Sequence, residues 1–459
     1  MKFFDALFEA MLVPMYLLIG VWGADVTERR NAAMKFFLYT LVGSLLMLVA
    51  ILAVYFMAGK SGERSFDYAT LYNNLLSANR EVSECLRGVN GVSTCDRLSV
   101  DSTAYGLWRY GPYLFFAFAL AFAIKVPLFP VHTWLPDAHT QAPVAGSMVL
   151  AGVMLKMGTF GFWRFAVPLF PAMARQYQTL IATLAVIGIV YGAFMCLAQK
   201  DIKRLIAYSS VSHLGYCMLG MFAFTPEGAT GSAYQMLNHG VSTGALFLLF
   251  GYLYERRHVR LMSDYGGIAK VMPVFAAFFL VVTFSSIAVP GTNGFVGEFL
   301  VLLGTFKSNL PMAIGVLATT AVILGAAYML WMVQKVFFGQ LTHDENKGLK
   351  DLGFRELITA VPFLVLIVVM GLRPQPVLDL LNPSTTRYIA RAKYANGENV
   401  SPEKVKIENT REMPRQGRVM AESTSPTFVP GVGFAKKLRV AEGVQFADEP
   451  TLILSPKAP

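Results

Sequence analysis

Five ionisable residues lie inside long apolar stretches of the sequence, where charged side chains are rare. In chain order they are an acid, two amines, an imidazole and a second acid: Glu9, Lys125, Lys156, His239 and Glu298. A charge at the centre of a bilayer costs about 3 kcal/mol on insertion scales, so such residues usually face a partner, water or a transport path. The set therefore indicates a path for protons, which we favour over scattered structural ion pairs.

The residue types suit proton transfer. Burial in hydrocarbon favours the neutral form of a lysine, whereas a nearby carboxylate favours the ammonium, so a movable pair of Glu9 and Lys125 would act as a proton gate. Histidine suits the middle of such a path because imidazole titrates near neutral pH and either ring nitrogen can pass a proton. Glu298 stands close to Gly294 and Gly297 and is expected to act as an exit acid that faces water.

Three further histidines have more ordinary interpretations. His213 lies in the stretch SSVSHLGY, and we interpret it as a packing residue that hydrogen-bonds between helices, a common use of histidine inside membranes. His132 and His139 fall between two apolar stretches, where exposure to solvent or helix capping competes with a role in the proton path.

Two apolar stretches contain predicted helix breaks. Lys125 precedes Pro127 by two residues, and proline lacks a backbone donor and disfavours helix at the residue before it, so the helix should end beside the charge. Irregular backbone at membrane depth is tolerated only where it is buried in protein or lines a wet cavity. The stretch 270–308 is too long for one straight crossing and is interrupted by Pro290, Gly291 and Asn293, which predicts a second broken helix.

The composition predicts an all-α polytopic membrane protein. Of 459 residues, 55% are hydrophobic and only 15% are charged, which excludes an ordinary soluble domain. At roughly 20 residues per crossing, ten apolar segments have spanning length. They are 3–23, 33–58, 109–131, 145–170, 178–198, 202–225, 229–254, 270–308, 311–338 and 354–372.

The basic residues predict the orientation. The formal net charge of +10 comes from short loops and the C-terminal tail, without a basic and aromatic module for nucleic acid. Lysine and arginine in short loops mark the cytoplasmic or matrix side, and four groups fall on one side of the predicted spans. These groups are Arg29, Arg30 and Lys35; Lys200, Lys203 and Arg204; Arg256, Arg257 and Arg260; and Lys335, Lys347 and Lys350.

The polar loop 59–108 and the tail from about residue 373 are then expected on the opposite side. Cys85 and Cys95 in that loop could form a disulfide in an oxidising compartment, although two thiols ten residues apart leave the pairing open. The tail beyond 384 has mixed charge and few apolar runs, so we expect an extended peptide with at most one or two short helices that lies on neighbouring subunits, or plain disorder.

At the same residues the sequence resembles the antiporter-like subunits of respiratory complex I, and is closest to the type called NuoM in bacteria and ND-four in mitochondria. The resemblance covers most of residues 3 to 378. It rests on FEAMLVPMYLLIGVWG, KFFLYTLVGSLLMLVAILA, AFAIKVPLFPVHTWLPDAHTQAPVAGSMVLAGVMLKMGTFGFWRF, AQKDIKRLIAYSSVSHLGY, HGVSTGALFLLFGYLYERRH and VPGTNGFVGEFLVLLGTF.

The resemblance implies a role for each of the five residues. Glu9 and Lys125 would form the family's coupling ion pair, Lys156 and His239 its central relay, and Glu298 the acid that exchanges protons. It also implies two antiporter-like repeats of inverted topology in the distal membrane arm. The expected divisions are an incomplete first repeat with the polar loop at 1–170, a second repeat at 171–338, a final helix at 339–383 and the tail at 384–459.

The sequence departs from the family's pattern at its N-terminus. The family has fourteen helices, and this sequence starts at the helix that corresponds to the fifth. Either the sequence is truncated or a separate chain supplies the missing helices. The expected partners are other membrane-arm subunits, including neighbouring antiporter-like subunits, together with membrane lipids. No cofactor is expected in this subunit, because NADH, FMN, iron–sulfur clusters and ubiquinone would be bound by the rest of the complex.

The leading hypothesis is thus a proton-translocating subunit of NADH:quinone oxidoreductase in a mitochondrial inner or bacterial cytoplasmic membrane. A subunit of a multisubunit Mrp-type Na⁺/H⁺ antiporter shares the broken helices and the pattern of lysine and glutamate. A structural spacer of the membrane arm, whose ion pairs only hold helices together, is the third possibility, and it should tolerate neutral isosteres.

Overall fold

The computed structural model describes residues 2–59, 64–88 and 94–400, all within one unit, Met1–Thr410. Throughout these residues the regular structure is helical, and the only extended pairing is an isolated bridge between Asp201 and Leu261. The predicted all-α fold is therefore confirmed. Residues 401–459, which hold most of the predicted tail, lie outside the described residues.

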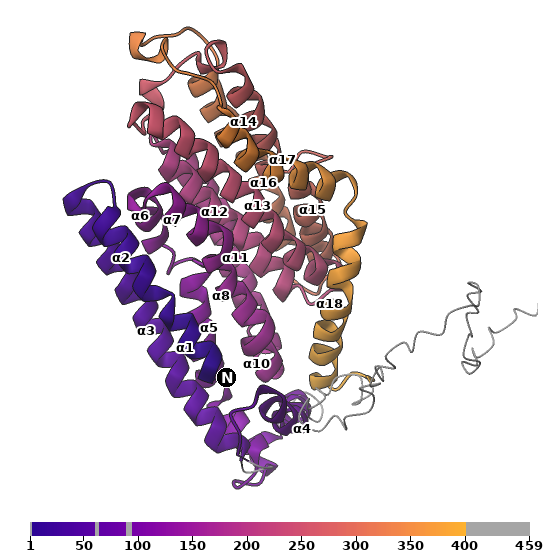
Figure 1. Cartoon of the computed structure of the whole chain (residues 1–459). Helices are drawn as coiled ribbons and strands as arrows, with labels where there is room; N and C mark the ends of the chain where they lie inside the picture. The colour runs from indigo at the N-terminus through magenta and orange to yellow at the C-terminus, as the bar shows by residue number, and fades with distance from the viewer. Residues whose placement is uncertain (1, 60–63, 89–93, 401–459) are drawn as a thin grey trace, which may run out of the picture. The chain divides into compact units, whose positions relative to one another are not determined.

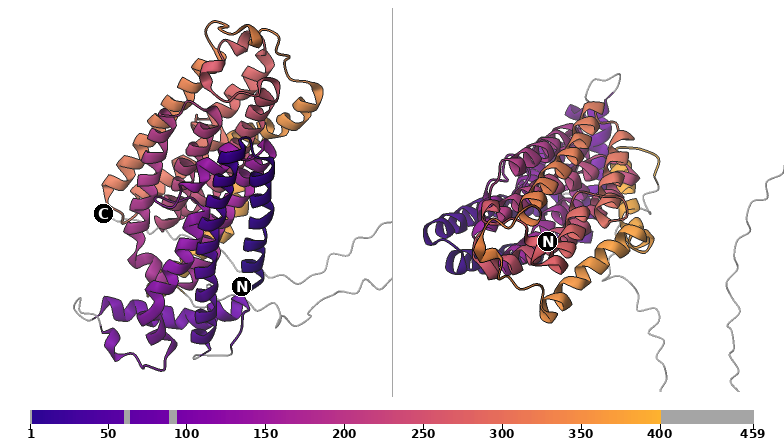
Figure 2. Two further views of the ribbon diagram at one scale, coloured as in Figure 1. Left: turned by 90° about the vertical axis from the view of Figure 1, so that its left-hand side faces the viewer. Right: turned by 90° about the horizontal axis from the view of Figure 1, so that it is seen from above.

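Eight of the described helical segments are long and apolar enough to cross a membrane. They are α3 (Val26–Ala58), α5 (Thr103–Lys125), the run Val144–Leu169, α11 (Gln178–Leu197), α12 (Ile202–Phe222), α13 (Pro226–Arg257), α16 (Met312–Phe337) and α17 (Phe354–Leu372). Shorter apolar helices are α1 (Lys2–Ala10) with α2 (Leu12–Trp22), α14 (Pro273–Ser286) and α15 (Asn293–Phe306). Every one of the ten predicted segments is helical over most of its length. Figures 1 and 2 show α2 and α3, in indigo, side by side.

The run Val144–Leu169 is not a uniform α-helix. It consists of α7 (Val144–Val149), a π-helical turn η2 (Leu150–Met154), α8 (Leu155–Gly161), a second π-helical turn η3 (Phe162–Ala166) and α9 (Val167–Leu169). A π-helical turn widens the helix locally and is frequent at functional sites. The two turns stand on either side of the short helix that contains Lys156.

The first predicted break is confirmed. Helix α5 ends at Lys125, and α6 (Trp134–Gln141) begins only after an irregular segment. A carbonyl left free by the break at Ile124 accepts a hydrogen bond of 2.8 Å from Trp134 Nε1, so a buried side chain replaces the missing helical donor. The break is thus surrounded by protein.

The second predicted break is also confirmed, because α14 ends at Ser286 and α15 begins at Asn293. The Asn293 side chain accepts from Ser285 Oγ at 2.5 Å and donates to Ser242 Oγ of α13 at 3.4 Å. Its backbone carbonyl accepts from Asn238 Nδ2 at 2.7 Å. Buried polar groups from α13 therefore satisfy the interrupted helix.

Helix α8 approaches the end of α5 closely. A Cβ atom on Gly158 would lie 2.8 Å from the carbonyl oxygen of Phe122 and 2.8 Å from the backbone nitrogen of Val126. Only glycine permits this approach of two backbones. The contact fixes the helix of Lys156 against the broken end of the helix of Lys125.

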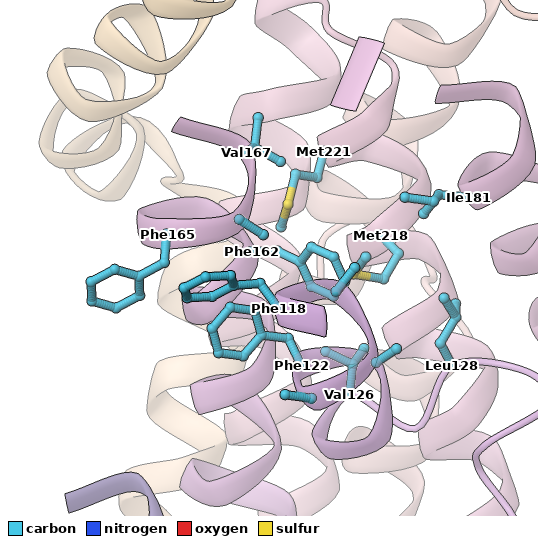
Figure 3. Close-up of a cluster of buried hydrophobic side chains, with 14 of the residues drawn as sticks. Phe118, Phe122, Val126, Leu128, Phe162, Phe165, Val167, Ile181, Met218 and Met221 are labelled. Atoms are coloured by element: carbon cyan, nitrogen blue, oxygen red, sulfur yellow. The ribbon is translucent and has the colours of Figure 1, made fainter. Parts of the chain in front are cut away.

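Aromatic and sulfur-containing side chains fill the space around this contact. Figure 3 shows Phe118 and Phe122 of α5 beside Phe162 of η3, with Met218 and Met221 of α12 next to them. The ring centroids of Phe122 and Phe162 are 5.8 Å apart. Close-packed aromatic rings hold α5, η3 and α12 in one arrangement.

The polar stretch 59–108 is not only a loop, because α4 (Tyr68–Arg87) occupies 20 residues of it. The Asp67 side chain accepts from the backbone N–H of Thr70 and so caps the helix. One face of α4 is buried, including Leu71, Leu75 and Val82. Cys85, in the last turn of α4, forms a disulfide with Cys95, which begins the short 3-10 turn Cys95–Arg97.

The start of the tail is also more ordered than predicted. Helix α18 (Gln375–Ala395, orange in Figure 1) has 21 residues and extends into the predicted tail as far as Ala395, where at most one or two short helices were expected. Its buried residues include Tyr388, Ile389 and Ala392, and the helix packs on α13, α4 and α10 (Pro171–Gln176). The predicted division at 383/384 falls inside this helix.

Ion pairs join the predicted basic loops at one end of the helices. Lys35 Nζ lies 2.7 Å from Asp137, and Arg204 lies 3.5 Å from the same carboxylate. Arg260 lies 3.3 Å from Asp201. These contacts link segments that are far apart in sequence, as expected if they share one side of a membrane.

Candidate functional site

Lys156 lies where η2 meets α8, and its surroundings follow from the π-helical turn. The widened turn leaves the carbonyl of Ala151 available, and Lys156 Nζ donates a hydrogen bond to it. The same amine donates to His239 Nδ1 of α13 at 2.5 Å. The two residues predicted as the central relay are therefore in direct contact.

A pair of glycines brings the two helices close enough for this contact. A Cβ atom on Gly240 of α13 would lie 3.1 Å from the carbonyl oxygen of Gly152 in η2, which is tighter than ordinary van der Waals contact. Gly240 follows His239 directly in sequence. Small residues at a crossing of membrane helices allow such an approach, and here the approach sets the distance between amine and imidazole.

Glu298 lies on α15 and is only 5% exposed. Its Oε1 atom accepts a hydrogen bond from His213 Nδ1 at 2.9 Å and another from Gln235 Nε2 at 3.1 Å. The second break positions this carboxylate, because α15 starts at Asn293, five residues earlier. The predicted acid is thus buried and hydrogen-bonded to an imidazole from α12.

His213 is the residue whose place differs most from its interpretation as a simple packing histidine. Its ring faces that of His239, with centroids 5.9 Å apart, while its other side contacts Glu298. Four titratable groups therefore form a row: Lys156, His239, His213 and Glu298. The sequence contained a signal for His213, since it follows Ser209, Ser210 and Ser212 on an otherwise apolar helix.

The two bonded pairs in this row are separated by a small polar cavity. The cavity has a volume of about 10 Å³, and its lining includes Asn238, Ser242, Ser285 and Ser286. This volume is close to the minimum that holds one water molecule. His239 also lines this cavity, and its Nε2 atom has no hydrogen-bond partner among the described residues. A single water could join the two pairs.

Glu9 and Lys125 are near each other but not hydrogen-bonded. Lys125 is 2% exposed, and its Nζ lies 4.6 Å from the centre of the ring of Phe8, the residue before Glu9. Within the part of the chain that the structure describes, Lys125 Nζ and Glu9 Oε1 are both buried atoms without a hydrogen-bond partner. The predicted pair is therefore open in this structure.

His132 and His139 are both buried, which excludes the solvent-exposed alternative for each of them. His139 stacks on Phe247 of α13 at 4.7 Å between ring centroids. Beside it a cavity of about 380 Å³ is lined in part by Lys203 and Glu255. Lys203 is buried and donates to the carbonyl of Ala142, although the sequence placed it among the loop residues.

The described residues contain no cluster of histidine, cysteine, aspartate or glutamate with the geometry of a metal site. What the arrangement offers is a buried row of acids, amines and imidazoles. Neighbouring groups in this row are either hydrogen-bonded directly or separated by a space for one water molecule. Titratable groups arranged in this way can form a proton path.

Comparison with known proteins gives a consistent result. Residues 3–325 match the family described as NADH:quinone oxidoreductase/Mrp antiporter, transmembrane. NADH-quinone oxidoreductase subunit M of Rhodobacter capsulatus is 44% identical over 390 residues, which is 84% of this chain and 70% of that protein.

Two solved structures are similar in fold. A chain of respiratory complex I from Thermus thermophilus matches with a TM-score of 0.73 and 35% identity, over 85% of this chain and 75% of the other. A chain of the Mrp complex from Dietzia sp. matches with a TM-score of 0.69 and 19% identity, over 85% of this chain and 74% of the other. At that identity the second match concerns the fold alone.

Proposed function

The chain belongs to the NADH:quinone oxidoreductase/Mrp antiporter transmembrane family, and from this membership we propose which of its residues move protons. The chain is an antiporter-like, proton-translocating subunit of the membrane arm of NADH:quinone oxidoreductase, in an energy-conserving bacterial or mitochondrial membrane. It contributes to the enzyme as a translocase subunit. The redox chemistry of quinone reduction takes place in other subunits.

The relay that we propose runs through Lys156, His239, His213 and Glu298. The observation that supports it is the pair of hydrogen bonds, Lys156 to His239 and His213 to Glu298, whose imidazoles face each other across 5.9 Å. Each group can give up or accept a proton, and imidazole can do both through its two nitrogens. A proton moves from the amine toward the carboxylate when the polar cavity connects the two rings.

Glu9 and Lys125 form the gate of this proposal. Among the described residues Lys125 Nζ has no hydrogen-bond partner, and we propose that a movement toward Glu9 closes an ion pair and the reverse movement opens it. A closed pair stabilises the ammonium, and an open pair releases its proton toward the interior.

The finer assignments of partners and cofactors are part of the proposal. We place NADH, FMN, iron–sulfur clusters and ubiquinone in other subunits, and neighbouring antiporter-like subunits against this chain in the membrane. The identities of 44% and 35% to proteins of complex I, against 19% to the Mrp chain, favour this assembly over an Mrp-type antiporter.

Substitution of the gate lysine tests the proposal. In the intact complex reconstituted into vesicles, Lys125→Met should lower proton pumping about tenfold or more, as expected when an acid–base group is lost. Coupled quinone reduction should fall with it. Pumping is measured with a pH-sensitive dye during NADH oxidation.

Lys335→Met is the matched control, because Lys335 is exposed and stacks over Trp331 at 4.3 Å, away from the row of buried groups. The control should pump normally. Normal pumping by an assembled Lys125→Met complex would instead identify the chain as a structural spacer. A purified complex without flavin and iron–sulfur subunits would identify the Mrp-type assembly.

A further inference from the structure

The end of α17 lies directly against the second helix break. A Cβ atom on Gly371, the next-to-last residue of α17, would lie 2.3 Å from the carbonyl oxygen of Gly291 and 2.5 Å from the Cα atom of Thr292. Real Cβ atoms essentially never come closer than 3.0 Å to such a neighbour. Only a residue without a side chain therefore fits here, and the two backbones are in direct contact.

The segment that Gly371 contacts is the turn that leads into α15. Gly291 has a φ of +94°, in the left-handed region. The backbone N–H and the side-chain hydroxyl of Thr292 both donate to the carbonyl of Val289, at 3.1 and 2.7 Å. Asn293 follows directly as the first residue of α15. The turn therefore sets where α15 begins.

Glu298 lies five residues beyond Asn293 on the same helix, so a shift of the turn also moves its carboxylate. A side chain at position 371 would have to increase the distance to the Gly291 carbonyl oxygen from 2.3 Å to at least 3.0 Å. The hydrogen bond from His213 Nδ1 to Glu298 Oε1 is 2.9 Å long. A similar increase, to about 3.6 Å, would break it. The contact at Gly371 therefore bears on the position of the proposed exit acid.

Helix α13 holds both the end of α17 and the carboxylate. The Tyr234 hydroxyl donates a hydrogen bond of 2.7 Å to the carbonyl of Met370, the residue before Gly371. Carbonyls in the last turn of a helix have no partner in their own helix, so this hydroxyl anchors the end of α17. The next residue of α13, Gln235, donates to Glu298 Oε1 at 3.1 Å. Neighbouring residues of one helix thus fix both groups.

Helix α17 is attached to α13 near both of its ends. Close to its start, the Glu356 carboxylate accepts two hydrogen bonds of 2.7 Å from the Arg256 guanidinium, and paired contacts of this kind are geometrically specific. Near its other end, Met370 accepts from Tyr234. A helix that is attached at both ends resists moving away from a larger residue at position 371. The turn before α15 would therefore move instead.

We infer that Gly371 is a positioning residue for the proton relay. Because it has no side chain, the end of α17 supports the turn before α15, and this support keeps Glu298 within hydrogen-bond distance of His213. Gly371 itself carries no proton. Its effect on pumping rests on the proposed function, whereas its effect on the position of Glu298 is a property of the fold and can be measured separately.

Gly371→Ala tests this inference in the intact complex reconstituted into vesicles. Proton pumping during NADH oxidation should fall about tenfold or more, as for the loss of a proton-transfer group. The infrared band of the Glu298 carboxyl group, identified by its absence from the Glu298→Gln complex, should shift because the hydrogen bond to His213 changes. A residue that only stabilised the fold would leave this band in place in the assembled complex.

Gly244→Ala is the matched control. It adds the same methyl group to α13 on the side of α17, but a Cβ atom there would meet the Phe363 side chain at 3.6 Å, an ordinary van der Waals contact. Pumping and the Glu298 band should be those of the parent. An unshifted band in the assembled Gly371→Ala complex would overturn the inference. Normal pumping by the Glu298→Gln complex would contradict the relay instead, and the band would still decide whether Gly371 positions Glu298.

Tyr234→Phe decides the question if the Gly371→Ala complex fails to assemble. This variant removes the hydroxyl that anchors Met370 and adds no atom, so the end of α17 is held less firmly against the turn. Pumping should fall about fivefold, as expected for the loss of one buried hydrogen bond, and the Glu298 band should shift. Full pumping together with the parental band in this variant would show that the end of α17 does not position Glu298.

Discussion

At the scale of single residues, His213 decides how far the row of buried groups extends. Without it, Glu298 would have no titratable hydrogen-bond partner among the described residues, and the pair of Lys156 and His239 would end at a small cavity. The Nδ1 hydrogen bond to Glu298 and the ring contact with His239 place His213 between the two halves. The expected hydrogen bond between helices is present, and from this position we propose that His213 also takes part in the relay.

His213→Gln tests this interpretation. Glutamine retains a donor for Glu298 but does not titrate, so we expect proton pumping to fall about tenfold or more, as for loss of a proton-transfer group. His343→Gln should have no effect, because His343 is an exposed loop residue whose ring bonds only a backbone carbonyl. Pumping and quinone reduction are compared in assembled complexes. Full pumping by the His213→Gln variant would show that His213 has only a structural role.

At the scale of elements, the contact of α8 with α5 depends on one glycine. Gly158→Ala would force backbone atoms of Phe122 and Val126 away from α8, and overpacking of this kind costs about 1 to 3 kcal/mol. We expect a lower temperature for dissociation of the purified complex. Gly325→Ala in α16 is the control, because a Cβ atom there meets nothing within 4 Å, and its dissociation temperature should not fall. Equal behaviour of the two variants would contradict the close approach of α8 and α5.

The sequence predicted the spanning helices and both breaks because their signals are local. Apolar runs of about 20 residues specify the spanning helices, and prolines beside charges specify the breaks. Neither signal depends on a tertiary contact. Helices α4 and α18 escaped prediction because their sequences are polar on average, and they are helical through amphipathic packing on α5 and α13. A hydropathy average over consecutive residues mixes the apolar and the polar face of such a helix, so it does not identify the helix.

The candidate site, like the fold, could be predicted from the sequence only in part. A lone charge in an apolar run is visible in sequence, so Lys125, Lys156 and Glu298 stood out. Which of these groups meet depends on helix crossings, and those follow from contacts such as Gly152 with Gly240. For that reason neither the place of His213 nor the open state of Glu9 and Lys125 was predictable.

At the scale of the whole molecule, the ion pairs of Lys35 and Arg204 with Asp137 mark one end of the described helices, and α4 marks the other. The Cys85–Cys95 disulfide lies at the second end, and disulfides persist in oxidising compartments. Basic short loops mark the cytoplasmic or matrix side. Both observations support the same orientation of the helices in the membrane.

Labelling from one side of sealed vesicles tests the orientation. Asp101→Cys, next to α5, should react with a membrane-impermeant thiol reagent added outside right-side-out vesicles, since Asp101 is exposed. Lys347→Cys, in the loop before α17, is exposed as well and should react only after the membrane is permeabilised. The opposite pattern would reverse the assignment of sides. Labelling of both positions from outside would exclude the proposed topology.

The spacing of the two imidazoles also has a consequence for the idle enzyme. Moving one proton across a membrane with a potential of 100 mV changes its free energy by about 2.3 kcal/mol. A continuous chain of hydrogen bonds would therefore let protons leak back and discharge the membrane whenever NADH ran out. No direct hydrogen bond joins His213 to His239 among the described residues, and their ring centroids lie 5.9 Å apart. If protons follow the proposed relay, we expect this gap, when it holds no water, to keep the resting complex from discharging the membrane between turnovers.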